Sequence, residues 1–276
     1  MVAYRPKVPS LLWRVRELEA QPHSIVAYAR EYPPGHLVER HHHERAQLIY
    51  ASKGIMRVDT PRGIWVLPPM RAIWVPPEVE HEIRTQSTVC LRTLLIRPGL
   101  RTSLPRDCCV VDVSLLLREL ILRTVALGQT EPPSTPSVHL VEVILDEIKE
   151  VKALPLHIPM PSDARALKIC HGILENPADG RTCSQWGTSV GASARTLERL
   201  FQKETTINFS SWRRHVRLLA ALTRLAEGAP VATVALDLGY ESPSAFTAMF
   251  KRTLGRPPSE FFRNQQLTNE TTAIAS

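Results

Sequence analysis

Apolar and polar positions alternate in two different rhythms along the 276 residues of this chain. Between residues 24 and 97, short β-rich runs are separated by proline and glycine turns, a pattern typical of a small all-β sandwich or barrel. From residue 112 onward, apolar positions recur every three or four residues, which predicts helices over 112–127 and 137–152. The clearest β runs are residues 47–50, 55–59, 64–67, 72–75 and 89–96.

A stretch with three prolines, residues 153–161, separates the two halves and is predicted to be an interdomain linker. Residues 1–110 form the predicted β domain, and its first 20 residues are predicted to be an irregular arm. The two helices of 111–152 have apolar stripes that either cover the β domain or pair with a second subunit. Residues 162–265 are predicted to be almost wholly helical, and residues 266–276 a flexible tail.

Two stretches of the helical half repeat one pattern about 49 positions apart. Each copy predicts a short helix, a glycine-containing turn and a second helix that starts at a serine. This is a helix-turn-helix, whose second helix enters the DNA major groove. Two copies in tandem favour DNA binding much more strongly than one would. The matched positions are Ser193, Leu197, Leu200 and Phe201 in the first copy and Ser242, Phe246, Met249 and Phe250 in the second.

Local signals place the ends of several predicted helices. Ser162 is expected to cap a helix through residue 174, with Asp163 in its first turn. A long helix over residues 210–227 connects the two repeats and stops at Gly228. Pro243 suits the first turn of the last recognition helix. A connecting helix of about 18 residues spans roughly 27 Å, which could hold two recognition helices about one DNA turn apart.

Composition adds the charge and the compartment. The net charge of +7 and the pI near 9.4 favour a polyanionic partner, and 43% apolar residues exclude wholesale disorder. No signal peptide and no apolar run of roughly 18 residues is visible, so a cytoplasmic location is expected. The five cysteines are odd in number and lack zinc-finger spacing, so free thiols are expected.

The first predicted recognition helix carries the side chains best suited to base contacts. If the apolar positions of residues 193–204 face inward, Gln202 and a set of four polar residues point outward. An arginine there presents a fork to guanine O6 and N7. The second recognition helix is poorer in polar groups and is expected to contribute more phosphate and shape recognition. The candidates are Arg195, Thr196, Glu198 and Arg199 on the first helix and Ser244, Ala245, Thr247, Ala248 and Lys251 on the second.

Four further arginines are open to two interpretations. Arg213, Arg214, Arg217 and Arg263 are either phosphate contacts or solvated surface charge.

These residues together resemble the AraC/XylS family of bacterial transcription regulators. The resemblance covers roughly residues 163–265 and rests on residues 239–242, Phe246, Phe250, Lys251, residues 255–259 and Phe262. It implies two helix-turn-helix units joined by one long helix, promoter DNA as partner, a homodimer, and RNA polymerase as a further partner if the protein is an activator. By position, the family's base-contacting residues coincide with the candidates above. Gly187 replaces a usual alanine, which should loosen that helix, and Ala248 stands where some members carry arginine.

The triple histidine is the chemical feature of the β half. His41 and His43 are two apart, so on a strand they share one face while His42 points to the other. Gln47 would share the face of His41 if the strand ran on without a bulge, and His81 follows on a later segment. Imidazoles that converge inside a barrel are candidates for a metal site.

The same spacing resembles the cupin fold. Gly35, His41, His43, Gln47 and Gly54 match its first motif, and Pro76, Glu78 and His81 approximate its second. Gln47 stands where metal-binding cupins usually have glutamate, and Glu78 where glycine is usual. Without that carboxylate, metal affinity should fall, although three nitrogens could still hold zinc, nickel or iron.

Three interpretations of the histidines therefore stay open at this point. They bind a divalent metal, they hydrogen-bond an organic effector together with Gln47, or they fill the barrel mouth. Five further residues are candidates for lining a pocket, although the two tryptophans among them are expected in the core. They are Arg45, Arg57, Arg71, Trp65 and Trp74.

The sequence as a whole predicts two domains, an N-terminal all-β cupin-like barrel with appended helices and a C-terminal all-α tandem helix-turn-helix domain. The predicted function is a sequence-specific DNA-binding transcriptional regulator that responds to a small molecule or metal in the barrel, with no catalytic residue. The alternative is a metal-dependent cupin enzyme with an accessory helical domain. Gln47 and the two helix-turn-helix motifs argue against that alternative.

Overall fold

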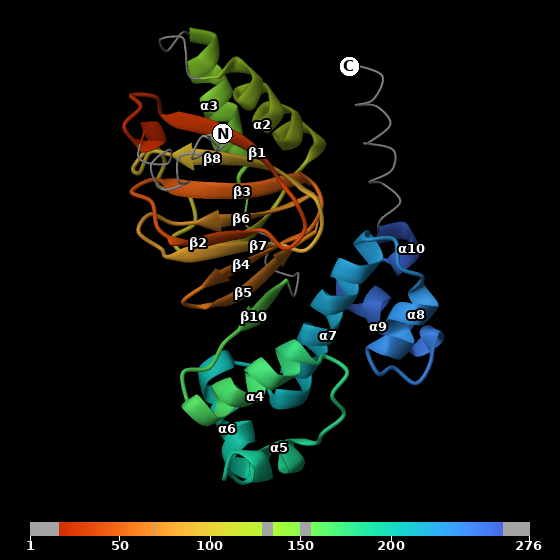
Figure 1. The fold of residues 1–276 in the computed structure, drawn as a ribbon. Helices are drawn as coiled ribbons and strands as arrows, with labels where there is room; N and C mark the ends of the chain where they lie inside the picture. Colours follow the sequence, from red (N-terminus) through yellow and green to blue (C-terminus); the bar gives the residue numbers. More distant parts are fainter. Residues whose placement is uncertain (1–16, 69, 129–134, 150–155, 262–276) are drawn as a thin grey trace, which may run out of the picture. The chain divides into compact units, whose positions relative to one another are not determined.

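The computed structural model describes residues 17–68, 70–128, 135–149 and 156–261 (Figure 1). They fall into two compact units. The first contains Met1–Pro61 and Met70–Lys152, and the second contains Arg62–Pro69 and Ala153–Ser276. The first is a β structure with appended helices, and the second is mainly helical, which confirms the predicted fold class.

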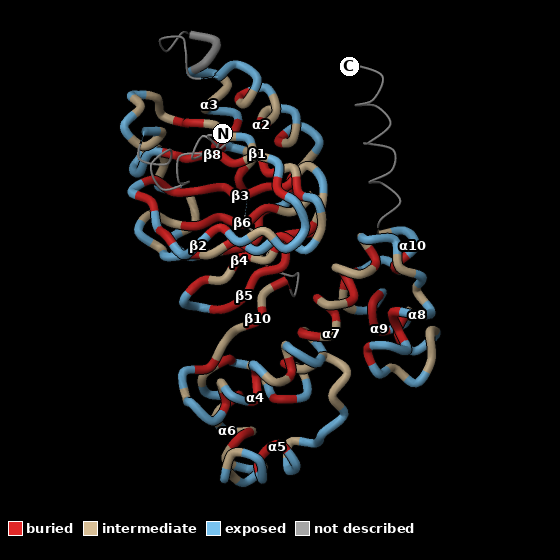
Figure 2. Tube along the Cα trace, in the orientation of Figure 1, coloured by how far each residue is buried: buried red, intermediate tan, exposed pale blue. Residues whose placement is uncertain are grey.

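Two antiparallel five-stranded sheets form the β structure. Leu48, Ile49 and Tyr50 are all buried, so β3 is covered on both faces, whereas β4 alternates buried and half-buried positions (Figure 2). In sheet order, the first sheet comprises β1 (Ile25–Tyr32), β8 (Val89–Ile96), β3 (Ala46–Lys53), β6 (Arg71–Val75) and β9 (Cys109–Asp112). The second comprises β10 (His157–Pro159), β5 (Gly63–Leu67), β4 (Met56–Thr60), β7 (His81–Thr85) and β2 (Leu37–His41).

Two helices cover one face of the first sheet. The buried sides of α2 (Leu115–Leu127) and α3 (Thr135–Glu147) join one apolar core with the strands, through residues such as Leu117, Ile121 and Ile144. Their outer sides keep large apolar residues in solvent. These are Leu115, Leu116 and Leu127 on α2 and Val138 and Val143 on α3, a set we call the apolar helix patch.

In the described part of the second unit seven helices follow, and side-chain caps explain where several of them begin. The long helix α7 joins the two motifs, with α4, α5 and α6 at one end and α8, α9 and α10 at the other (Figure 1). Ser193 caps α6, Asn208 caps α7 and Ser242 caps α9, each through its side chain. The bounds are α4 (Ala164–Glu175), α5 (Cys183–Ser189), α6 (Ala194–Thr205), α7 (Phe209–Ala226), α8 (Val231–Asp237), α9 (Pro243–Leu254) and α10 (Pro258–Phe261).

Three local expectations need correction. Asp163, not Ser162, caps α4, because its carboxylate accepts from the Arg165 and Ala166 amides, while the Ser162 hydroxyl donates to Glu204. Gly187 allows a close approach instead of merely loosening α5, since a Cβ there would lie 2.4 Å from the Ala192 carbonyl oxygen. The segment expected to be a linker contains a short strand, β10, paired with β5 through His157 and Trp65.

No helix in the part of the chain that the structure describes is both long and apolar enough to cross a membrane.

Candidate DNA-binding surface and histidine site

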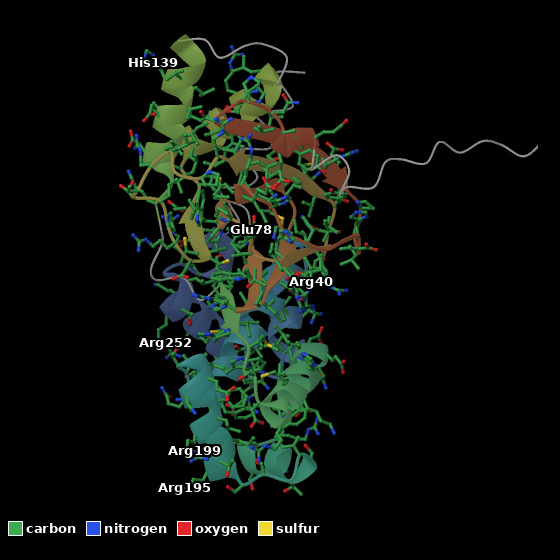
Figure 3. The ribbon with its side chains drawn as sticks, turned by 90° about the vertical axis from the view of Figure 1, so that its left-hand side faces the viewer. Arg40, Glu78, His139, Arg195, Arg199 and Arg252 are labelled. Atoms are coloured by element: carbon green, nitrogen blue, oxygen red, sulfur yellow. The ribbon has the colours of Figure 1, made fainter. Side chains whose placement is uncertain are left out.

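The first recognition helix, α6, presents two arginines to solvent. Leu197 and Phe201 are fully buried on its inner side, whereas Arg195 and Arg199 are exposed and project away from the ribbon (Figure 3). They lie four residues apart, one helical turn along the same side. Thr196 is half-buried, with its hydroxyl 2.9 Å from that of Ser193.

The other two polar residues considered for this helix are engaged within the protein. Glu198 is half-buried, and its Oε2 accepts a hydrogen bond from the Phe209 amide at 3.4 Å. The Gln202 side chain donates to the Thr206 carbonyl at 3.0 Å. The sequence could not reveal these contacts, because the partners belong to the turn after α6 and the start of α7.

The second recognition helix, α9, buries Phe246, Met249 and Phe250. On its outer side a shallow depression of about 380 Å³ is lined by Pro243, Ser244, Thr247, Ala248 and Lys251. Ala245 is exposed beside it. The surface is small-residue rich, with its positive charge at Lys251 and Arg252 near the C-terminal end (Figure 3).

Of the four further arginines, two hold the fold together. Arg217 donates to the carbonyls of Pro177, Ala178 and Asp179, and Arg213 donates to the Arg181 carbonyl. Arg214 is exposed and donates to the Ser211 hydroxyl of its own helix, which leaves its other guanidinium N–H groups available to a phosphate. Arg263 lies outside the described residues.

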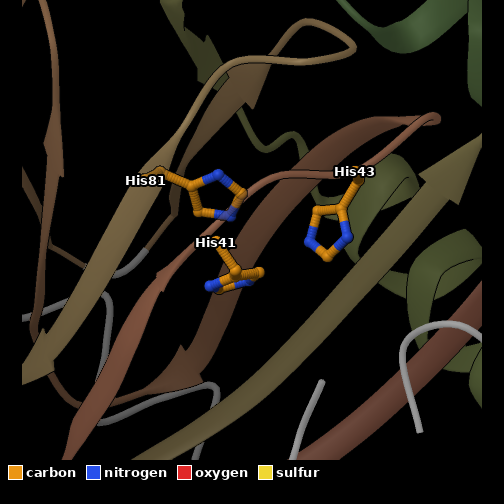
Figure 4. Close-up of side chains that lie close together, drawn as sticks. All are labelled: His41, His43 and His81. Atoms are coloured by element: carbon orange, nitrogen blue, oxygen red, sulfur yellow. The ribbon is translucent and has the colours of Figure 1, made fainter. Parts of the chain in front are cut away.

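Three histidines converge inside the first unit (Figure 4). His41 ends β2 and is paired in register with His81 of β7, and His43 follows two residues after His41. The ring centroids are 4.4 Å apart for His41 and His81, 4.8 Å for His41 and His43, and 5.2 Å for His43 and His81. One nitrogen of each ring lies within 4.8 Å of one from each other ring. His42 points outward to Glu78, as the alternation predicts.

Burial keeps these imidazoles neutral. The exposed fractions are 8% for His41, 3% for His43 and 0% for His81. Burial lowers the pKa of His43 to about 3, helped by its histidine neighbours, and lowers the pKa of His81 to about 4. Burial also lowers the pKa of His41. All three rings are therefore unprotonated near pH 7, with nitrogen lone pairs available to a ligand.

His41, His43 and Gln47 line a cavity of about 20 Å³, together with apolar and hydroxyl side chains such as Tyr28, Tyr32 and Thr93. A volume of this size holds about one water molecule. Gln47 is buried, and among the described residues its Oε1 has no hydrogen-bond partner.

A short segment that the sequence did not flag, residues 17–23, closes this cavity. Leu18 lines it directly. Arg45, buried to 5% exposure, donates to the carbonyls of Glu19, Gln21 and His23 and so fastens the segment to the barrel. Glu19 Oε1 accepts from the Glu44 amide at 2.8 Å and lies 3.6 Å from His43 Nδ1. No local motif signals these contacts, because they join positions more than 20 residues apart.

The other residues considered as pocket lining lie elsewhere. Arg57 pairs with Asp59 and Arg71 with Asp112. Trp74 is a core residue whose Nε1 donates to the Pro105 carbonyl, and Trp65 stacks on His157 at 4.0 Å between ring centroids.

The architecture defines a class: a ligand-binding β domain joined to a tandem helix-turn-helix domain. Residues 23–128 match the AraC-like ligand binding domain, and residues 186–264 match a helix-turn-helix domain family. The chain is 34% identical over 221 residues to the HTH-type transcriptional regulator NimR of Escherichia coli K12, covering 80% of this chain and 81% of that protein. It is 29% identical over 131 residues to the arabinose operon regulatory protein of Escherichia coli K12, covering 45% and 43%.

Among solved structures, ToxT from Vibrio cholerae is similar at a TM-score of 0.37 and 11% identity, over 87% of this chain and 98% of that one. The chain belongs to the AraC family of DNA-binding transcriptional regulators with an N-terminal ligand-binding domain. Its named relatives are bacterial transcription regulators, and regulators of this family bind DNA and a small-molecule effector.

Proposed function

We propose that the chain binds a defined promoter sequence chiefly through Arg195, Thr196 and Arg199 of α6, and that a ligand in the histidine cavity controls this binding. The observation that carries the proposal is the pair of exposed arginines one turn apart on a recognition helix. Glu198 of the same helix accepts a hydrogen bond from the Phe209 amide, which ties α6 to the start of α7 and so helps to position the two arginines. This role is in addition to any base contact that Glu198 makes. Ser244, Ala245, Thr247, Ala248 and Lys251 of α9 contribute groove shape and phosphate contacts.

The histidines and Gln47 serve ligand binding and not turnover. The chain then acts in the cytoplasm, where promoter DNA is found, and contacts RNA polymerase if it activates transcription. An enzymatic function at His41, His43 and His81 would be favoured instead by substrate turnover together with an absence of any sequence-specific DNA site.

The test is fluorescence anisotropy of the full chain with DNA from upstream of its own gene, at one fixed salt concentration. Specific binding at least about 10³ times tighter than to scrambled DNA is expected. Equal affinity for the two DNAs at all salt concentrations would refute sequence-specific regulation.

The apolar helix patch supports a homodimer. Leu115 and Leu116 are 63% and 52% exposed on α2, and packing against a second subunit would remove their apolar surface from water. We expect Leu115→Glu with Leu116→Glu to convert a dimer into monomers in analytical ultracentrifugation, because buried carboxylates would lose their hydration. Leu236→Glu on α8 is the matched control, since Leu236 is 58% exposed outside the patch. An unchanged dimer in the α2 variant would place the interface elsewhere.

A further inference from the structure

We infer that His41, His43 and His81 form a three-nitrogen site for a divalent transition-metal ion such as Zn²⁺, closed by the segment 17–23. The inference rests on the proposed function in one respect, since it names the chemical class of the ligand that the sensor domain binds. Three features of the site carry it: the tautomers of the rings, the groups behind them, and the small size of the cavity that His41 and His43 line.

The hydrogen bonds of two rings fix which nitrogen is free. His41 Nδ1 lies 2.7 Å from the Glu39 carbonyl oxygen, and His81 Nδ1 lies 3.0 Å from the Val79 carbonyl oxygen. A carbonyl oxygen only accepts hydrogen bonds, so each Nδ1 must carry the proton. Each Nε2 is then unprotonated, and its lone pair can coordinate a metal ion. This tautomer, held by a backbone carbonyl, is the one found in histidine ligands of metals.

For the third ring, that of His43, the Glu19 carboxylate takes the place of the backbone carbonyl. His43 Nδ1 lies 3.6 Å from Glu19 Oε1, and among the described residues neither nitrogen of His43 has a partner at full hydrogen-bond geometry, although the Gln47 side chain interacts with the ring. His81 Nε2 is likewise buried without a partner. Leaving such polar atoms unsatisfied in the interior costs free energy. An ion bound at the Nε2 atoms would satisfy them and would polarise the His43 Nδ1–H toward Glu19, as in carboxylate–histidine–zinc arrangements.

The cavity beside His41 and His43 favours an ion over an organic molecule. These two histidines, but not His81, line a space of about 20 Å³, which accepts an ion or a water molecule, whereas pockets for small organic ligands measure about 300–1,000 Å³. Nitrogen donors select zinc, nickel, copper or ferrous iron rather than magnesium or calcium. A Zn–N bond of about 2.0–2.1 Å requires nitrogens about 3.4 Å apart, so binding draws the three rings closer than the present 4.8 Å limit.

The experiment uses the full chain, stripped with a chelator and then titrated with Zn²⁺ against a chromophoric competitor. We expect one ion per chain, and with Co²⁺ a visible d–d absorption that reports nitrogen ligands. His81→Ala and His43→Ala should each weaken binding by more than about 100-fold, and Glu19→Gln by about 10-fold or more. His42→Ala is the matched control, since His42 is adjacent in sequence but exposed. Far-UV circular dichroism verifies that the variants fold.

Glu19→Gln keeps the test decisive if a histidine variant fails to fold, because the glutamine preserves size and leaves the three ligands in place. Zinc affinity that is unchanged in a folded His43→Ala or His81→Ala variant, or the absence of any tight ion, would overturn the metal site, and unchanged affinity in Glu19→Gln would overturn the role given to Glu19.

The same protein is then assayed for promoter DNA with and without Zn²⁺, and an affinity change of about fivefold or more is expected. Specific DNA binding without tight metal binding would overturn this inference alone. Metal binding without any specific DNA site would leave the site standing and refute the proposed function. Tight metal binding that leaves DNA affinity unchanged would overturn the role of the ion as sensor ligand.

Discussion

Trp212→Ala is expected to lower the free energy of unfolding of the helical unit by about 3–5 kcal/mol. Trp212 is fully buried in the first turn of α7. Its ring packs edge-on to Phe201 at 5.7 Å between centroids, and its Nε1 donates to the Pro159 carbonyl at 2.7 Å. Truncation leaves a large cavity and an unpaired carbonyl at once. Urea unfolding followed by far-UV circular dichroism measures the loss.

Trp212→Phe separates the two contributions. It keeps most of the aromatic area but removes the hydrogen bond to Pro159, so a smaller loss of about 1–3 kcal/mol is expected. A loss below about 1 kcal/mol in Trp212→Ala would contradict the central position of this residue in the helical core.

Replacing Arg195 and Arg199 together by alanine is expected to remove the base preference of the first half of the DNA site. Each arginine that bonds a guanine in the fork geometry gives about 1–3 kcal/mol of discrimination. The double variant should therefore tolerate any base at the two positions that Arg195 and Arg199 contact. The positions of the DNA site that these arginines do not contact should keep their preference. Competition binding with a set of single-base-pair variants of the site measures this profile.

Arg214→Ala is the comparison for that experiment, because it removes one arginine outside the recognition helices. Arg214 is exposed on α7 and outside both recognition helices. A phosphate contact carries no base information, so its loss should weaken all sequences alike and reduce the salt slope by about 1. If the arginine pair on α6 behaved in the same uniform way, it would be a phosphate contact and not a base contact.

The helical half could be predicted closely because its signals are local. The repeat aligned Ser193 with Ser242, and both serines cap recognition helices. The long helix and its stop at Gly228 also depend on neighbouring residues only. The sequence predicts the cap of α4 one residue early, since Ser162 and Asp163 can both cap a helix. Only the distant Glu204, which binds Ser162, decides between them.

The histidine site could be predicted in part. Strand alternation was enough to set His41 and His43 inward and His42 outward. The covering segment was missed, because the bonds from Arg45 to the backbone of residues 17–23 have no signature in either stretch. Arg45 was a candidate for lining the pocket, whereas in the structure its guanidinium holds residues 17–23 against the β domain through backbone hydrogen bonds. Which nitrogen of each ring is free likewise depends on backbone carbonyls whose position only the fold determines.

Selection of binding sites from a random DNA pool by the full chain tests the central claim most directly. Two tandem recognition helices joined by the 18-residue α7, roughly 27 Å long, predict two short conserved boxes about one helical turn apart. The box contacted by α6 should be the better conserved, and it should disappear with the Arg195 and Arg199 double variant. An enriched pool without any shared sequence, or a single box unaffected by that variant, would contradict the account.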